Sequence, residues 1–254
     1  MENIKTICPV CGREYVPRVY MVNGVRKSLQ VPQCGCMNEK FNALLKFINA
    51  DNRTGKKRPF AGLSELPPEL SKLSFDKLEQ SDAKDFARQF VQTFSPKNRG
   101  FGFIGETGRG KSTMAAVICM QLREKNFRTL FVKTSALLDF FTDSMRLNSA
   151  FTTDELLKEL RSFDFVVLDD FARETYTERR LEYIFRIADE LVTYEICTAF
   201  TANPEMIRRL KSENYRYRAD FEAIFDRLSG LCPKIFTFKG ESYRRHRVCA
   251  SQER

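Results

Sequence analysis

The chain has 254 residues, 43% of them hydrophobic and 30% charged, which is enough for one or two domains with a large core. No apolar run approaches the roughly 20 residues of a membrane-spanning helix, and the start of the chain lacks the apolar stretch of a secretory signal. We therefore expect a cytoplasmic protein with no membrane partner, whose eight cysteines stay reduced.

The net charge of +9 is concentrated at both ends of the chain. Residues 1–60 hold 11 Lys and Arg against 4 Asp and Glu, and residues 205–254 hold 12 against 7. Residues 61–204 hold 19 against 22, so two basic ends flank a nearly neutral middle. Such ends suit contact with nucleic acid or with an acidic partner, and they equally fit a solvated surface rich in Lys and Arg.

Two closely spaced cysteine pairs, a CxxC and a CxC, come first along the chain. The four residues are Cys8, Cys11, Cys34 and Cys36. Four thiolates in two pairs match the ligand set of a tetrahedral Zn²⁺ site, and the metal would supply folding energy to a segment with little core. A redox CxxC and four unrelated cysteines are the alternatives. We predict a zinc-binding domain over residues 1–49, ending in an amphipathic helix over 37–49.

Residues 50–74 are polar and contain several Gly and Pro, which predicts a linker. From about residue 80 onward, short apolar strands alternate with helices. Strands are expected at 100–104, 129–133, 163–168, 197–201 and 234–238. Helices are expected at 82–94, 112–125, 135–147, 153–161, 178–194, 204–212 and 218–228. This alternation predicts an α/β domain over 75–254, with a five-stranded parallel sheet covered on both faces.

The segment GETGRGKS matches the phosphate-binding pattern G-x-x-x-x-G-K-[ST], between an expected strand and an expected helix. Its residues are Gly105, Glu106, Thr107, Gly108, Arg109, Gly110, Lys111 and Ser112, with Thr113 following. Glycines let backbone N–H groups surround a phosphate, and the helix adds its positive end. Lys111 would contact the β- and γ-phosphates and Ser112 would ligate Mg²⁺. The segment therefore predicts binding of ATP or ADP with Mg²⁺; a chance match in a Gly-rich turn is the alternative.

Two later strands end in polar residues. Asp169 and Asp170 follow an apolar run, as expected for a Walker-B motif in which Asp169 holds Mg²⁺ and Asp170 polarises the attacking water. Asn203 follows the next strand and would orient that water and sense the γ-phosphate. The alternatives are an acidic cap of the strand and an Asn N-cap before Pro204.

These motifs give the chain a family resemblance over roughly residues 65–247. The matching segments are GETGRGKS at 105–112, VVLDDFARE at 166–174, FTANPEMI at 200–207, FDRL at 225–228 and GESYRR at 240–245. In order and spacing they resemble the AAA+ ATPases of the DnaC/DnaI helicase-loader and IstB group. The N-terminal cysteines resemble the DnaI-type and phage-type loaders in particular, since IstB-type proteins generally lack that module.

The resemblance implies roles for two arginines. Arg227 matches the arginine finger that reaches the γ-phosphate of a neighbouring subunit, and Arg244 matches the sensor-2 arginine that acts within its own subunit. Surface arginines are the alternative for both. Arg173 departs from the family pattern, because loaders often have Gly-Ala-Glu in this loop.

The segment that leads into the helix at 178–194 touches single-stranded DNA in initiator-like relatives. Tyr176, Arg179 and Arg180 offer an aromatic ring for stacking and cations for phosphates. An exposed helix start is the alternative.

The function that the resemblance implies is the loading of a hexameric replicative helicase. ATP-bound subunits would associate in a ring or spiral, grip single-stranded DNA and hold the helicase through the zinc domain, and hydrolysis would release it. An IstB-like transposition ATPase that recruits a transposase is the second hypothesis. A zinc adaptor that binds nucleotide without hydrolysing it is the third.

Overall fold

The computed structural model describes residues 15–22, 25–32, 59–60, 73–145, 149–173 and 176–240, with the first two ranges described by their backbone alone. The chain divides into two compact units, Met1–Arg58 and Pro59–Arg254. The cysteine pairs, the helix expected at 37–49 and Arg244 lie outside the described residues. In the parts that are described, no helix is both long and apolar enough to cross a bilayer.

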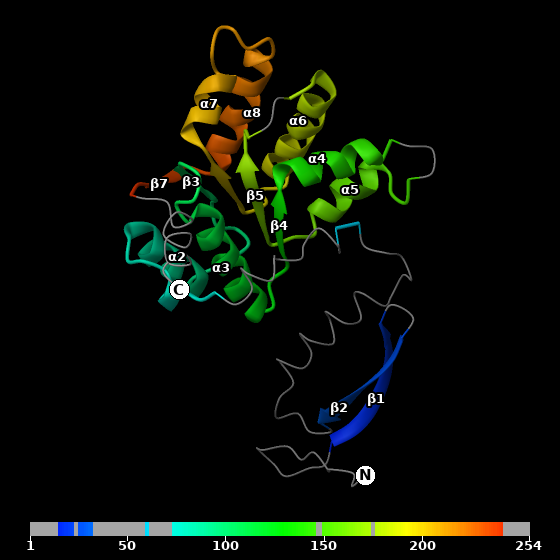
Figure 1. The fold of residues 1–254 in the computed structure, drawn as a ribbon. Coiled ribbons are helices and arrows are strands. Elements are labelled where there is room, and N and C mark those ends of the chain that lie inside the picture. The colour runs from blue at the N-terminus through cyan, green and yellow to red at the C-terminus, as the bar shows by residue number, and fades with distance from the viewer. Residues whose placement is uncertain are drawn as a thin grey trace, which may run out of the picture. The chain divides into compact units, whose positions relative to one another are not determined.

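The first unit contains an antiparallel β-hairpin. Strand β1 (Tyr15–Val22) pairs with strand β2 (Val25–Pro32), in a register that joins Tyr15 to Pro32 and Val22 to Val25 (Figure 1). The sequence analysis did not predict this hairpin. The signal for it is the dipeptide Asn23-Gly24 between two runs rich in Val and Tyr, a pair of residues that favours a two-residue hairpin turn.

The second unit contains the predicted five-stranded parallel sheet. Its strands are β3 (Phe101–Gly105), β4 (Thr129–Lys133), β5 (Phe165–Phe171), β6 (Thr198–Ala202) and β7 (Lys234–Phe238). They lie in the order β4-β5-β6-β3-β7, and every neighbouring pair is parallel. The α/β fold class is therefore confirmed, with strand β3 near the middle of the order and β7 at one edge (Figure 1).

Helices cover both faces of this sheet. They are α2 (Asp82–Gln92), α3 (Lys111–Glu124), α4 (Thr134–Asp143), α5 (Thr153–Leu160), α6 (Glu178–Thr193), α7 (Pro204–Leu210) and α8 (Arg218–Leu231). Strand alternation divides the core in two: Phe131 packs with α2 and α3, whereas its neighbours Leu130 and Val132 pack with α4 to α8. Each helix begins within one residue of its expected start.

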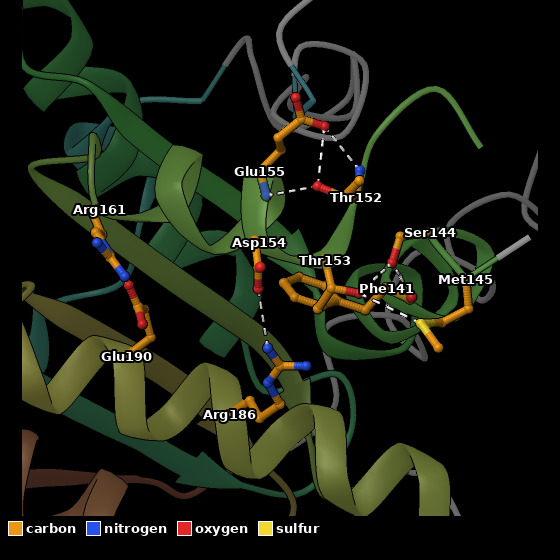
Figure 2. Close-up of polar contacts among 10 residues, drawn as sticks. All are labelled: Phe141, Ser144, Met145, Thr152, Thr153, Asp154, Glu155, Arg161, Arg186 and Glu190. Carbon is orange, nitrogen blue, oxygen red and sulfur yellow. Dashed lines mark hydrogen bonds and ion pairs between the residues drawn. The ribbon is translucent and has the colours of Figure 1, made fainter.

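Local side-chain contacts fix the start of α5 and its packing on α6 (Figure 2). The hydroxyl of Thr152 accepts a hydrogen bond from the Glu155 N–H at 3.3 Å, and the Glu155 carboxylate accepts one from the Thr152 N–H at 3.0 Å. This capping box satisfies two N–H groups that the first helical turn leaves unpaired. Ion pairs of Asp154 with Arg186 and of Arg161 with Glu190 then join α5 to α6.

Phe60 lies inside the range expected as a linker, yet it is buried. Its ring packs within 5.8 to 6.5 Å, between centroids, of Phe140, Phe141 and Phe163. A buried Phe side chain contributes about 2–3 kcal/mol of hydrophobic stabilisation. At least this part of the 50–74 range therefore belongs to the core of the second unit.

Candidate nucleotide-binding site

The candidate site lies at the carboxyl ends of three adjacent strands, β5, β6 and β3 (Figure 1). Because these strands are parallel, their ends meet at one edge of the sheet. The phosphate-loop sequence follows β3, Asp169 and Asp170 lie at the end of β5, and Asn203 follows β6. The topology thus brings together the three segments that the sequence singled out.

Glycines shape the loop between β3 and α3. Gly108 has φ of 83° and Gly110 has φ of 85°, in the left-handed region that side chains with a Cβ disfavour. Gly110 is also the N-cap of α3, so Lys111 opens the helix. At the end of β3, a Cβ on Gly105 would lie 2.5 Å from the carbonyl oxygen of Phe238. The pattern's glycines are therefore required by backbone geometry.

Both cations of the loop contact Glu106. Lys111 is 7% exposed, and its ammonium donates to the Glu106 carbonyl at 2.7 Å. The Arg109 Nη2 pairs with the Glu106 carboxylate at 2.5 Å, whereas the Arg109 Nη1 is buried with no hydrogen-bond partner among the described residues. A buried charged donor without an acceptor is costly, and an anion in the loop would supply that acceptor. The loop therefore fits a phosphate group.

Asp169 is buried, with 3% of its surface exposed, and the Thr201 hydroxyl donates a hydrogen bond to its carboxylate. Burial raises the pKa of Asp169, hydrogen bonds from Thr201 and Ser112 oppose that rise, and the charge of Asp170 adds to it. A cation at this point would favour the ionised form. Since Mg²⁺ prefers oxygen ligands, the adjacent Ser112 hydroxyl and Asp169 carboxylate fit a magnesium ion.

Thr201 is a site residue that the sequence analysis missed. Its hydroxyl donates to Asp169 Oδ1 at 2.6 Å and accepts from the backbone N–H of Asp170 at 2.9 Å, and the residue is fully buried. Thr134 adds a hydrogen bond of 3.0 Å from its hydroxyl to the Asp169 carbonyl. One side chain of β6 thus fixes both acids at the end of β5.

Asp170 differs from Asp169 in its surroundings. It has φ of 54°, and the pairing of β5 with β6 shifts register between Leu168 and Phe171. Its carboxylate accepts a hydrogen bond from Arg173 Nη1 at 2.7 Å. From the sequence, the unusual Arg173 leaves the geometry of this loop undecided. In the structure, the loop is a turn with a strained backbone at Asp170, closed by the ion pair between Asp170 and Arg173.

Asn203 is the N-cap of α7, as the alternative interpretation expects. Its side-chain oxygen accepts from the Glu205 N–H at 2.9 Å, and Pro204 occupies the first helical position. Because the cap uses the amide oxygen, a contact with water or phosphate would come from the amide nitrogen.

Arg227 lies on α8 and contacts α6. Its Nε lies 3.7 Å from the Asp189 carboxylate, its guanidinium lies 4.3 Å from the centre of the Phe185 ring, and its Nη1 donates to the Ala223 carbonyl at 3.3 Å. These contacts place Arg227 in the layer of α6 and α8. The guanidinium is held against that layer by one cation–π contact and one ion pair.

The expectation that Tyr176 stacks on a DNA base is wrong. Tyr176 is 2% exposed, its ring stacks near Phe221, and its hydroxyl accepts from the Ala172 N–H at 3.2 Å. Arg180 forms an ion pair with Asp139, and Arg179 is exposed. Tyr176 thus has a packing role in the loop after β5.

Sequence comparisons find relatives of two kinds. The replicative helicase loader DnaC of Escherichia coli K12 is 26% identical over 164 residues, a match that spans 63% of this chain and 66% of DnaC, just under two thirds of that protein. A putative insertion sequence ATP-binding protein of Sinorhizobium fredii is 29% identical over 130 residues, which are 49% of this chain and 42% of that protein. No family model matches the chain.

Among solved structures, the crystal structure of DnaI superposes with a TM-score of 0.58, at 22% identity, over 73% of this chain and 99% of DnaI. At this identity the match shows the fold, and it agrees with the strand order described above. Together with the sequence relatives, it confirms the resemblance to the DnaC, DnaI and IstB group of AAA+ ATPases.

Proposed function

We propose that this relative of the DnaC helicase loaders is itself an ATP-dependent loader, which places a hexameric replicative DNA helicase onto single-stranded DNA. The observation that supports the proposal most is the meeting of Ser112, Asp169 and Thr201 beside the phosphate loop, in a chain with sequence similarity to DnaC. These residues are of the kinds that bind ATP and Mg²⁺, and the similarity to DnaC suggests that the site serves helicase loading.

Within the site, the residues divide the work of phosphoryl transfer. Lys111 and the loop amides would bind the phosphates, and Ser112 and Asp169 would hold Mg²⁺, which would supply positive charge beside the phosphates. Asp170 polarises the attacking water, and Asn203 orients that water through its amide nitrogen. Thr201 positions both acids.

Arginines complete the site across subunits. Arg227 reaches the γ-phosphate bound by a neighbouring copy, and Arg244 acts on the nucleotide of its own subunit. Because Arg227 contacts α6 in the single chain, assembly into a ring or spiral would redirect it. Hydrolysis then depends on self-association.

The N-terminal unit is proposed to bind zinc through Cys8, Cys11, Cys34 and Cys36 and to hold the helicase. The hairpin supports this, since its register places Tyr15 opposite Pro32, and the two cysteine pairs adjoin those residues in the sequence. The strands therefore offer a frame on which two distant pairs would be brought to one ion.

A second candidate function follows from the insertion sequence relative: a transposition ATPase that binds DNA and recruits a transposase. That relative matches about half of this chain, over 130 residues. The ATPase site would be the same in both functions, so the partner distinguishes them.

The deciding experiment is affinity capture of the full chain with either the replicative helicase or an IstB-associated transposase from the same cell, with ATP or ADP present. The loader predicts retention of the helicase that depends on the nucleotide. Lys111→Ala serves as the matched variant, because it removes the ammonium and leaves both units in place. Retention of the transposase alone would favour the second candidate, and retention of neither would refute the loader.

A further inference from the structure

A segment rich in cations and aromatic rings joins α7 to α8 and has no part in the site described above (Figure 1). Residues 206–220, here called the α7–α8 segment, run from the end of α7 to the first residues of α8 and hold five Lys and Arg against two Asp and Glu. Within them, the run Tyr-Arg-Tyr-Arg over 215–218 alternates rings with guanidinium groups. The Tyr215 hydroxyl donates to the Tyr176 carbonyl at 3.4 Å, so the segment lies beside the loop that follows β5.

Packing anchors the α7–α8 segment to the body of the domain. The rings of Tyr215 and Tyr217 meet edge to face, with centroids 6.1 Å apart, and both pack against the core on the side of the sheet that α4 to α8 cover. The Lys211 ammonium lies 4.1 Å from the centre of the Phe225 ring, on α8. The exposed cations of the segment are therefore presented from an anchored backbone.

Three guanidinium groups of the segment have no carboxylate partner among the described residues. Arg208, Arg209 and Arg216 are exposed and form no ion pair there, whereas Arg218 forms one within α8 at 3.0 Å. The Arg216 guanidinium lies 5.2 Å from the centre of the Tyr217 ring, in a cation–π contact that uses none of its N–H donors. Three such cations on one short segment attract an anionic partner.

We propose that the α7–α8 segment is a contact surface for the phosphate backbone of single-stranded DNA. Arg208, Arg209 and Arg216 each bind a phosphate, because the fork of a guanidinium matches phosphate oxygens. The Arg216 guanidinium, supported by the Tyr217 ring, also offers a planar surface on which a base stacks. This inference rests on the DNA binding in the proposed function and names residues for it, outside the segment at 176–180 that the sequence favoured.

Single-stranded DNA fits this surface better than an acidic protein does. A specific protein interface has an apolar core, which exposed aromatic or aliphatic side chains supply. In the described part of the chain, the large hydrophobic side chains that are exposed are Met145, Phe185, Val192, Tyr194 and Ile235, and none of them belongs to the α7–α8 segment. Binding to a nucleic-acid backbone depends mainly on cations that can contact phosphates, which the segment has.

The test is the fluorescence anisotropy of a fluorescein-labelled single-stranded thymidine oligonucleotide, titrated with the full chain and ATP at several salt concentrations. For a single strand, each phosphate contact adds about 0.7 to the steepness with which the logarithm of the affinity falls with the logarithm of the salt concentration. Arg209→Gln combined with Arg216→Gln should therefore reduce that steepness by about 1.4 and weaken binding about 25-fold in salt of about 0.1 M. Arg209→Lys combined with Arg216→Lys, which keeps both charges, should retain the steepness of the wild type.

Lys97→Gln combined with Arg99→Gln is the matched control. Both residues lie between α2 and β3, are exposed, and form no ion pair with any residue that the structure describes. This variant loses the same charge and should bind the oligonucleotide as the wild type does. An equal loss of affinity in both double variants would overturn the inference in favour of a general charge effect, and wild-type binding by Arg209→Gln with Arg216→Gln would overturn it outright.

Helicase capture by the same variants separates this inference from the proposed function. Wild-type DNA binding together with loss of the helicase in Arg209→Gln with Arg216→Gln would overturn the inference and assign the α7–α8 segment to a protein partner. A wild-type chain that does not bind the oligonucleotide would also overturn it. If the anisotropy results are as expected but no helicase is captured, the inference stands and only the loader is refuted.

Discussion

Replacing Thr201 with Val tests whether one buried hydroxyl organises the acids of the site. Valine keeps nearly the same shape, so the change removes two hydrogen bonds without opening a cavity. One of these bonds goes to the Asp169 carboxylate at 2.6 Å, and the other comes from the Asp170 N–H at 2.9 Å. The Thr201 hydroxyl makes both contacts, and Thr201 is fully buried.

The expected loss of stability can be worked out from those two contacts. A hydrogen bond to a charged group contributes about 1.5–3 kcal/mol, and a buried N–H left without an acceptor costs about 1–3 kcal/mol. Since the contact of the Asp170 N–H is only partly buried, water recovers some of its share, and we expect a total of about 2–4 kcal/mol. For a chain of this size, that corresponds to a fall in melting temperature of about 5–15 °C.

Thr201→Ser provides the control, because it keeps the hydroxyl and loses only a buried methyl group, at a cost of about 1 kcal/mol. Urea unfolding of the full chain measures both variants. Hydrolysis gives a second measure: without its donor, Asp169 binds a proton more readily, and the loss of such a supporting contact typically lowers metal affinity or activity about 10- to 100-fold. If Thr201→Val proves as stable and as active as Thr201→Ser, Thr201 does not organise the acids.

Three further experiments test other proposed roles. Asn203→Ser keeps an N-cap for α7 but removes the amide nitrogen, so hydrolysis should fall while the free energy of unfolding changes by less than about 1 kcal/mol; an unchanged rate would leave Asn203 as a cap alone. Arg227→Ala and Lys111→Ala should each be inactive, and mixing them should restore hydrolysis, because one supplies an intact phosphate loop and the other the finger; a mixture without activity would contradict action across subunits. Metal analysis of the purified chain should find about one zinc per molecule and less in Cys8→Ser, whereas a zinc-free wild type would refute the zinc site.

The parts of the fold that depend on local pattern were predictable. The apolar run of each strand and the residues that start each helix, such as the Thr152 capping box, are encoded within a few positions. Strand β5 is longer than expected because Lys133 pairs in register with Asp169, so that acid belongs to the ladder rather than to the loop after it. From the sequence alone, an acidic residue indicates the end of a strand. Only the pairing with the neighbouring strand shows that this acid is part of it.

The parts of the site that depend on contacts between distant segments were not predictable. Thr201 looks like an ordinary β-branched residue in β6, and only the neighbouring strand β5 gives its hydroxyl a function. From the sequence, Tyr176 is expected to be an exposed aromatic residue at a helix start. In the structure, its ring packs near Phe221 on α8, and its hydroxyl accepts a hydrogen bond from the Ala172 N–H. The decisive partner of Thr201 is Asp169, 32 positions away, and that of Tyr176 is Phe221, on another element.

The two adjacent acids have different surroundings because the pairing of β5 with β6 is irregular at this point. In a regular strand they would point to opposite faces, but Asp170 has φ of 54° and its N–H bonds to a side chain instead of a ladder carbonyl. Both charges then act at the same edge, since Asp170 raises the pKa of Asp169. Two neighbouring carboxylates are most easily ionised together when each has its own cation. Mg²⁺ would favour the ionised form of the buried Asp169, whereas the partly exposed Asp170 already pairs with the Arg173 guanidinium at 2.7 Å.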